Sequence, residues 1–90
     1  MIIHKFTLTQ PVNHVLMPAD AQVLCVQIQK TSQHEERICV WAKVDLDKPN
    51  VERIFRIIGT GHEFYDSKYN YIGTVQASGG FVWHIFEQIK

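Results

Sequence analysis

Residues 56–62 bring together the side chains best suited to ligand binding or chemistry in this chain. An apolar, strand-like run ends in Gly59, Thr60, Gly61 and His62, which we call the glycine turn. Glycine permits positive φ or the close approach of another molecule, and histidine changes charge near neutral pH. Arg56 offers a planar fork to phosphate or carboxylate, and the backbone N–H groups of the glycine turn could form an anion-binding nest. The segment therefore predicts a site for a small anion.

Aromatic residues near the glycine turn extend this predicted site. A loop over residues 61–70 carries Phe64, Tyr65 and Tyr69, and it either packs back as a lid or offers stacking surfaces to a base or a partner subunit. A nucleobase would stack on Tyr69 or Tyr71. The residues predicted to bind the ligand are Arg56, Gly59, Thr60, Gly61, His62, Tyr69, Tyr71 and His84.

Catalytic uses of the same residues have less support from spacing. Thr60 and His62 are two residues apart, but the intervening glycine bends the chain, so a nucleophile and its base are not clearly aligned. A cyclic-nucleotide-cleaving enzyme could use His62 and His84 as general base and general acid, with Arg56 or Lys43 on the phosphate. The alternative, which we favour, is that His62 caps a loop and His84 fills space over Gly73. We therefore expect no catalytic residues and no enzyme.

The cysteines and histidines do not have the spacing of a metal site. Zinc ligands drawn from Cys25, Cys39, His62 and His84 would have to come from four separate strands. Structural zinc sites usually contain a close pair in which one turn supplies two ligands. We therefore predict neither a metal nor another cofactor, and we expect both thiols to be reduced and partly buried.

Composition limits the class of protein. Ninety residues fit one domain, residues 1–90, and 46% hydrophobic with 20% charged residues is typical of a globular chain. Nine Lys and Arg balance nine Asp and Glu, so no overall field favours general nucleic-acid binding or an anionic membrane. Low net charge also leaves the association of like subunits unopposed, which makes a homo-oligomer our expectation.

Hydropathy indicates no membrane segment. The longest apolar stretches, residues 38–42 and 54–58, fall far short of the roughly 20 residues that a membrane helix needs. The amino terminus lacks a long apolar signal region. We therefore expect the protein in the cytosol of the cell that makes it.

The elements that must position these residues are predicted to be strands. β-branched and aromatic residues recur in seven runs separated by turn-forming residues. With no room for a covering helix layer, the chain is predicted to be all-β, a small antiparallel sandwich or open barrel of six to seven short strands. Residues 49–53, capped by Asp47, form the only helical candidate. The strands expected are residues 2–8, 14–17, 22–29, 37–45, 53–59, 71–77 and 80–87.

Two hairpins follow from the order of these strands. Residues 22–29 and 37–45 would pair with Cys25 facing Cys39, which places Leu24 on the core side. A second hairpin would close at Ser78 and Gly79. It would set His84 across from Gly73, Tyr71 across from Phe86 and Trp83 across from Thr74.

The two arginines of the fifth predicted strand differ in their expected roles. Arg53 and Arg56 are three residues apart, so they lie on opposite faces of an extended strand. Arg53 is expected to pair with Glu52 or Asp45 at the surface. Arg56 leads toward the glycine turn and is the better anion ligand.

Five segments together resemble a family of small bacteriophage proteins of unknown function: residues 17–21, 40–45, 55–62, 71–76 and 79–87. The likeness covers nearly the whole chain, and its most specific parts are the glycine turn and the Val-Trp-His run at residues 82–84. The resemblance implies a viral origin and expression in the host cytoplasm, and it carries no known catalytic residues. Phage proteins of comparable size and β content include counter-defence proteins that sequester nucleotide immune signals.

Our leading hypothesis is therefore a non-enzymatic phage protein that binds and sequesters a small anionic, nucleotide-type signal. The competing hypothesis is a protein-binding inhibitor of a host enzyme, or a virion adaptor, that uses an exposed edge strand or the aromatic loop. A third hypothesis is the cyclic-nucleotide-cleaving enzyme that uses His62 and His84.

Overall fold

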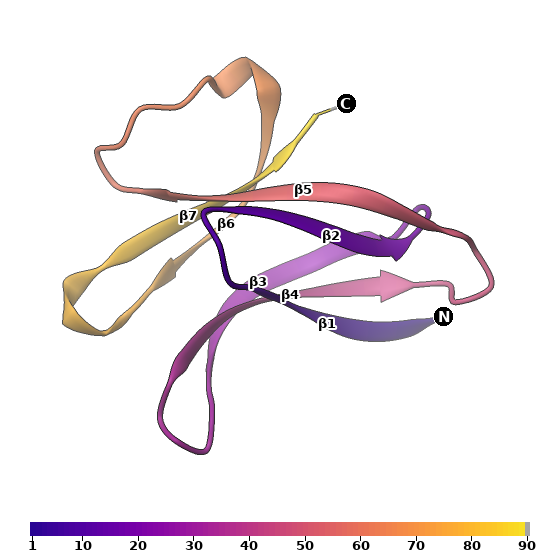
Figure 1. Ribbon diagram of the computed structural model, residues 1–90, viewed down its shortest axis with the longest axis horizontal. Coiled ribbons are helices and arrows are strands. Elements are labelled where there is room, and N and C mark those ends of the chain that lie inside the picture. Colours follow the sequence, from indigo (N-terminus) through magenta and orange to yellow (C-terminus); the bar gives the residue numbers. More distant parts are fainter. Residues whose placement is uncertain (90) are drawn as a thin grey trace.

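Seven antiparallel strands in two sheets make up the protein (Figure 1). The computed structural model describes residues 1–89, apart from the side chain of Asp66. The sheets are not closed into a barrel, so the predicted all-β sandwich is confirmed. One sheet has the order β1 (Ile2–Leu8), β4 (Glu36–Val44), β3 (Gln22–Lys30); the other has the order β2 (Val12–Pro18), β5 (Asn50–Gly59), β7 (Val82–Gln88), β6 (Tyr69–Gln76).

The core lies between the sheets and is built by alternation along the central strands. β4 contributes Val40, Ala42 and Val44, all fully buried. From the four-stranded sheet, Phe55 of β5 and Ile85 of β7 face them and are also fully buried. Burying one such side chain contributes roughly 1.5–3 kcal/mol. The opposite, outer face of the four-stranded sheet carries polar, aromatic and some aliphatic residues such as Val12 and Leu16, and the loop after β5 arches over it (Figure 1).

The β3–β4 hairpin differs in register from the prediction. Cys25 pairs with Trp41 and Cys39 pairs with Gln27, so the two thiols are not opposite each other. The last pair before the loop is Lys30 with Glu36, and this pair sets the register as far as Cys25. A bulge between Val23 and Cys25 then shifts the register by one residue. Because of the bulge, Leu24 is 46% exposed, and Val23 packs on the core in its place.

The predicted pairing of β6 with β7 is correct only at the end of the hairpin that lies far from the turn. Tyr71 pairs with Phe86 as predicted, but a bulge between Tyr71 and Gly73 shifts the remaining pairs by one residue. Thr74 therefore faces His84, and Trp83 faces Val75. The prediction that His84 fills space over Gly73 is wrong. Gly73 instead faces Ile85 and allows the close approach of β3.

Residues 49–53 do not form the predicted helical turn. β5 begins at Asn50, and Val51 pairs with Met17 of β2. The chain turns earlier, where Asp45 accepts hydrogen bonds from the amides of Asp47 (3.0 Å, to Oδ1) and Lys48 (3.1 Å, to the backbone carbonyl). The prediction was wrong because pairing with β2 gives these residues strand partners, which local turn propensity does not reveal.

Candidate functional site

The glycine turn is a β-turn at the end of β5. The amide of His62 donates to the carbonyl of Gly59 at 3.1 Å, and Gly61 has φ +87°. Positive φ at the third position is the signature of a type II turn and requires glycine there. The His62 amide is thereby committed within the turn, and Gly59 is buried in the strand opposite Trp83. The predicted anion nest of free amides is not formed by these two residues.

The imidazole of His62 packs over Gly59. A Cβ added at Gly59 would lie 3.0 Å from the His62 ring and 3.3 Å from Trp83, so the close packing here favours glycine. His62 lines a cleft of about 460 Å³ with Gly59, Thr60, Gly80, Phe81, Val82 and Trp83. The rings of Phe81 and Trp83 stack at 5.9 Å with planes 5° apart, and Phe81 is 59% exposed. We call this the Trp83 cleft.

His84 lies in a different setting, on the outer face of the four-stranded sheet. Its Nε2 is 2.7 Å from the Thr60 hydroxyl, and its Nδ1 is 3.0 Å from the Thr74 hydroxyl. The Thr74 hydroxyl is in turn 2.6 Å from that of Tyr71. These four side chains form a continuous hydrogen-bonded chain, which we call the His84 relay. Both ring nitrogens of His84 are thus engaged by hydroxyls, and none of these bonds involves His62.

The guanidinium of Arg53 is occupied by hydrogen bonds within the protein. Its Nε and Nη2 donate to the two carboxylate oxygens of Glu87 at 2.5 and 2.7 Å, and its Nη1 donates to the Ala21 carbonyl at 2.5 Å. The hydrogen bond to Glu87 raises the pKa of Arg53 above its usual range. The predicted partners were wrong, since Glu52 instead pairs with His14 at 3.1 Å. Glu87 lies 34 residues away and is reached only through the sheet.

Arg56 has no such partner and lies on the outer face, as the spacing predicted. Its Nη1 donates to the Tyr69 hydroxyl at 3.1 Å, and its Cζ sits 5.6 Å from the centre of the Tyr69 ring. Its buried Nε has no hydrogen-bond partner among the described residues. Arg56 lines a cavity of about 290 Å³ together with Glu63, Phe64 and Tyr65, which we call the Arg56 cavity.

The aromatic loop packs back onto the sheet through one ring and exposes another. Phe64 packs back, with its ring 4.8 Å from Phe86 and 6.5 Å from Tyr69. Tyr71 meets Phe86 edge-on at 5.4 Å. Tyr65 stays 77% exposed, with Lys68 Nζ 5.8 Å from its ring centre. One ring therefore anchors the loop, and another is presented to solvent.

The predicted ligand-binding residues therefore fall into three groups. Arg56 lines the Arg56 cavity and Tyr69 contacts Arg56 beside it, whereas Gly59 and His62 line the Trp83 cleft. Tyr71 and His84 belong to the His84 relay, whereas Thr60 takes part in both the relay and the cleft. Gly61 shapes the turn between them.

Sequence reasoning missed several residues of these sites. Thr74 could have been found only from the strand pairing beyond the β6 bulge. Glu63 lies beside the named aromatic residues but offered no pattern of its own. Phe81 and Trp83 were not linked to the glycine turn, and the structure places them together on the wall of a cleft beside it, with Trp83 also packed against the core.

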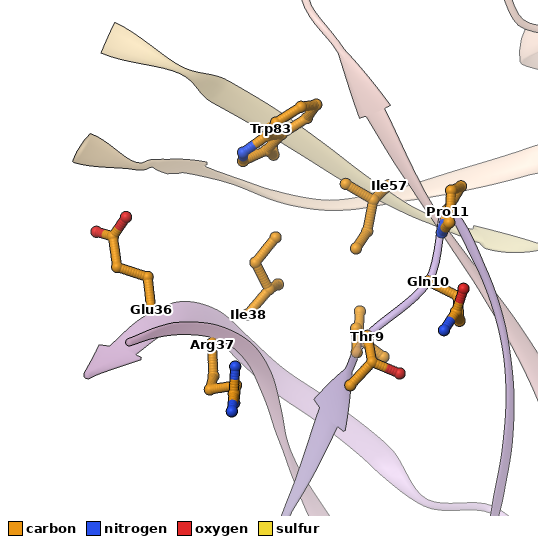
Figure 2. Close-up of a pocket in the computed structure, with 9 residues that line it drawn as sticks. Thr9, Gln10, Pro11, Glu36, Arg37, Ile38, Ile57 and Trp83 are labelled. Carbon is orange, nitrogen blue, oxygen red and sulfur yellow. The ribbon is translucent and has the colours of Figure 1, made fainter. Parts of the chain in front are cut away.

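A further cavity of about 370 Å³ opens between the sheets, at the end near the β1–β2 connection. Ile38, Ile57 and Trp83 form its apolar part, with Glu36 and Arg37 on the three-stranded sheet (Figure 2). The Glu36 carboxylate accepts hydrogen bonds from the Ser78 amide at 3.1 Å and the Ser78 hydroxyl at 2.7 Å. These bonds lower the pKa of Glu36. They also tie a hairpin of one sheet to a hairpin of the other.

The described residues contain neither a cluster of metal ligands nor a membrane-spanning helix. Within residues 1–89, no three His, Cys, Asp or Glu side chains gather where they could hold a metal ion. Of the four ligands weighed for zinc, Cys25 is exposed and Cys39 is buried, and the two histidines lie in the separate settings described above. No helix in the described part of the chain is long and apolar enough to cross a membrane.

Comparison with known proteins identifies the family but no activity. A family model described as a domain of unknown function (DUF7352) matches residues 1–90. The chain belongs to this family. No curated protein and no solved structure gives a significant match.

Proposed function

We propose that this family member binds a small, nucleotide-type anion in the Arg56 cavity without changing that anion chemically. The observation that carries the proposal is the state of Arg56. This arginine is half-buried and lines a cavity, and its Nε has no partner among the described residues. The phosphate would be bound by the guanidinium, with Phe64 and Tyr65 beside the base.

The contrast between the two arginines of β5 supports this assignment. Arg53 is neutralised by two hydrogen bonds to Glu87, whereas the ion pairs among the described side chains, which exclude that of Asp66, do not include Arg56. A desolvated donor without an acceptor is costly, so an anionic oxygen at Arg56 would relieve that cost. The Nη atoms would make the first contact, and an outward movement of Phe64 or Tyr65 would bring Nε within reach.

Glu63 narrows the class of ligand. Its carboxylate lines the same cavity as Arg56, so it disfavours inorganic phosphate and other compact anions by repulsion. It would instead accept hydrogen bonds from ribose hydroxyls or from an amino group of a base. Adjacent positive and acceptor groups suit a nucleotide, which carries both phosphate and hydrogen-bond donors.

The biological role that we propose comes from the resemblance to small phage proteins. In the cytoplasm of an infected bacterium, a protein that held such a nucleotide without changing it would remove an immune signal of the host. Association of several copies would be compatible with the balanced charge of the chain. This proposal keeps the predicted ligand contacts of Arg56, Tyr69 and the aromatic loop. It no longer assigns His62 and His84 to the phosphate.

A second candidate function has one observation in its favour. β1 is an edge strand, and Ile3 on its outward side is 60% exposed. An exposed apolar edge can accept a strand from another protein, as an inhibitor of a host enzyme or a virion adaptor would require. This function needs no small molecule.

Nucleotide binding measured by calorimetry tests the first proposal. The probes are a cyclic mononucleotide, a cyclic dinucleotide, ADP-ribose and inorganic phosphate. Arg56→Gln should weaken binding of the recognised nucleotide at least about tenfold, because a charged hydrogen bond is lost. Arg37→Gln is the matched control, since Arg37 is exposed on the other sheet.

Mass spectrometry of the ligand released by denaturation distinguishes the alternatives. Sequestration predicts that the nucleotide returns with its mass unchanged, and native mass spectrometry of the complex gives the subunit number. A cleaved product would favour the nucleotide-cleaving enzyme. Binding that survives Arg56→Gln in a folded protein would remove Arg56 from the site, and no binding of any probe would favour a protein partner.

A further inference from the structure

We propose that the Thr60 hydroxyl is an activated nucleophile, with His84 as its general base, and that it accepts an acyl group from esters of apolar or aromatic acids. This activity is separate from nucleotide binding at Arg56. Thr60 Oγ1 lies 2.7 Å from His84 Nε2, within the distance for proton transfer from nucleophile to base. A nucleophile, a base and a group that orients the base are thus in direct contact.

Proton positions in the His84 relay can be assigned so that each of its three hydrogen bonds has one donor and one acceptor. Neutral His84 carries its proton on Nδ1 and donates it to the Thr74 hydroxyl oxygen. Thr74 donates its own proton to the Tyr71 phenol oxygen. Nε2 is then left with its lone pair facing the Thr60 O–H. In this arrangement Thr74 accepts from Nδ1 and holds the ring of His84 in place, so it is a positioning residue.

Thr60 also meets the requirements of access and of a place for the substrate. It is exposed, and it lines the Trp83 cleft as well as the His84 relay. The walls of that cleft include Phe81, Val82 and Trp83, which suit an apolar or aromatic acyl group. The next residue is Gly61, so no side chain crowds the nucleophile from the following position.

The reaction balances without a cofactor. Thr60 Oγ1 attacks the ester carbonyl carbon, and its proton passes to His84 Nε2. The bond from the carbonyl carbon to the leaving oxygen then breaks, and the alcohol departs with the proton from His84. A water molecule repeats the sequence on acyl-Thr60 and releases the acid.

Labelling with a fluorophosphonate tests the proposal on the full chain. In this reaction a P–O bond to Thr60 forms and the P–F bond breaks, while the proton passes through His84 to solvent and fluoride leaves. Peptide mass spectrometry should place the adduct on Thr60, and Thr60→Val should abolish it. His84→Gln should slow labelling about 100-fold or more, the usual contribution of a general base. Release of p-nitrophenolate from p-nitrophenyl phenylacetate should fall in the same variants.

Two further variants separate positioning from folding. Thr74→Val should slow labelling several-fold, and Thr74→Ser should restore it because the hydroxyl returns. Thr9→Val, at an exposed threonine outside the relay, should label like the parent protein. An unlabelled parent protein would overturn the proposal, as would an adduct that persists in Thr60→Val. If His84→Gln fails to fold, Thr60→Val and the Thr74 pair decide the outcome.

The test is independent of the proposed nucleotide site. Thr60→Val should leave nucleotide affinity unchanged, since Thr60 is not among the residues lining the Arg56 cavity. Loss of labelling with intact nucleotide binding, or the reverse, would therefore identify which of the two proposals has failed.

Discussion

Gly73 of β6 lies directly against Val26 of β3: a Cβ added at Gly73 would come within 2.6 Å of Val26 Cγ1. The contact joins the edges of the two sheets, and it coincides with the bulge between Tyr71 and Gly73. That bulge also brings Thr74 opposite His84. The close packing of the sheets and the assembly of the His84 relay therefore depend on the same short stretch of β6.

Gly73→Ala should destabilise the protein. The added methyl group would overlap Val26, which is itself buried, and relief requires strand displacement or a strained rotamer. Overpacking of this kind costs about 1–3 kcal/mol of unfolding free energy, measurable by urea denaturation. The double variant Val26→Ala with Gly73→Ala should recover part of the loss. Strict additivity of the two single changes would contradict direct contact.

Breaking the pair between Arg53 and Glu87 should be among the more damaging changes at charged residues. Their side chains are only 19% and 16% exposed. Removing one partner leaves a partly buried charge unpaired, so Arg53→Met should cost roughly 1–3 kcal/mol of unfolding free energy. Arg53→Met combined with Glu87→Leu should cost less than Arg53→Met alone. An equal or larger loss in the double variant would show that lost packing, rather than the unpaired charge of Glu87, accounts for most of the destabilisation.

Acid should weaken the link between Glu36 and Ser78. The folded state lowers the pKa of Glu36 through hydrogen bonds from the Ser78 hydroxyl and amide. The link therefore stabilises the fold above the pKa of an unfolded glutamate, about pH 4, and this contribution is lost as pH falls through the lower folded pKa. Thermal melts from pH 7 to pH 3 should lose less stability in Ser78→Ala than in the parent protein. Parallel curves would contradict the assignment.

The fold was predictable because alternation and turn residues act locally. Strand positions, the opposite faces of Arg53 and Arg56, and the pairing of Tyr71 with Phe86 all follow from a period of two. Registers failed next to the connecting loops, where Cys25 already pairs with Trp41 and Thr74 with His84, and they shift again at the bulges at Leu24 in β3 and between Tyr71 and Gly73 in β6. Bulges reflect contacts between sheets, and such contacts leave no local pattern in the sequence.

The candidate sites were harder to predict, because their residues meet through non-local pairing. The glycine turn and Arg56 were identified by residue type, yet they serve different cavities. Thr60 and His84 are 24 residues apart and meet only because β5 pairs with β7. Glu87 likewise reaches Arg53 across the sheet. The sequence indicated what single residues could do chemically. Which of these residues lie together could be known only from the pairing register of the strands.

Substitution of Tyr65 should affect ligand binding in the Arg56 cavity without affecting the stability of the fold. Its ring lines the cavity but is 77% exposed, whereas Phe64 packs on Phe86. Tyr65→Ala should therefore leave the melting temperature nearly unchanged and weaken nucleotide binding, because stacking a base on an aromatic ring contributes about 1–3 kcal/mol. Phe64→Ala should lower both. Phe81→Ala, which removes an exposed ring from the Trp83 cleft, is the matched control and should not alter nucleotide affinity. Equal losses of nucleotide affinity in the Tyr65 and Phe81 variants would argue against a base bound at Tyr65.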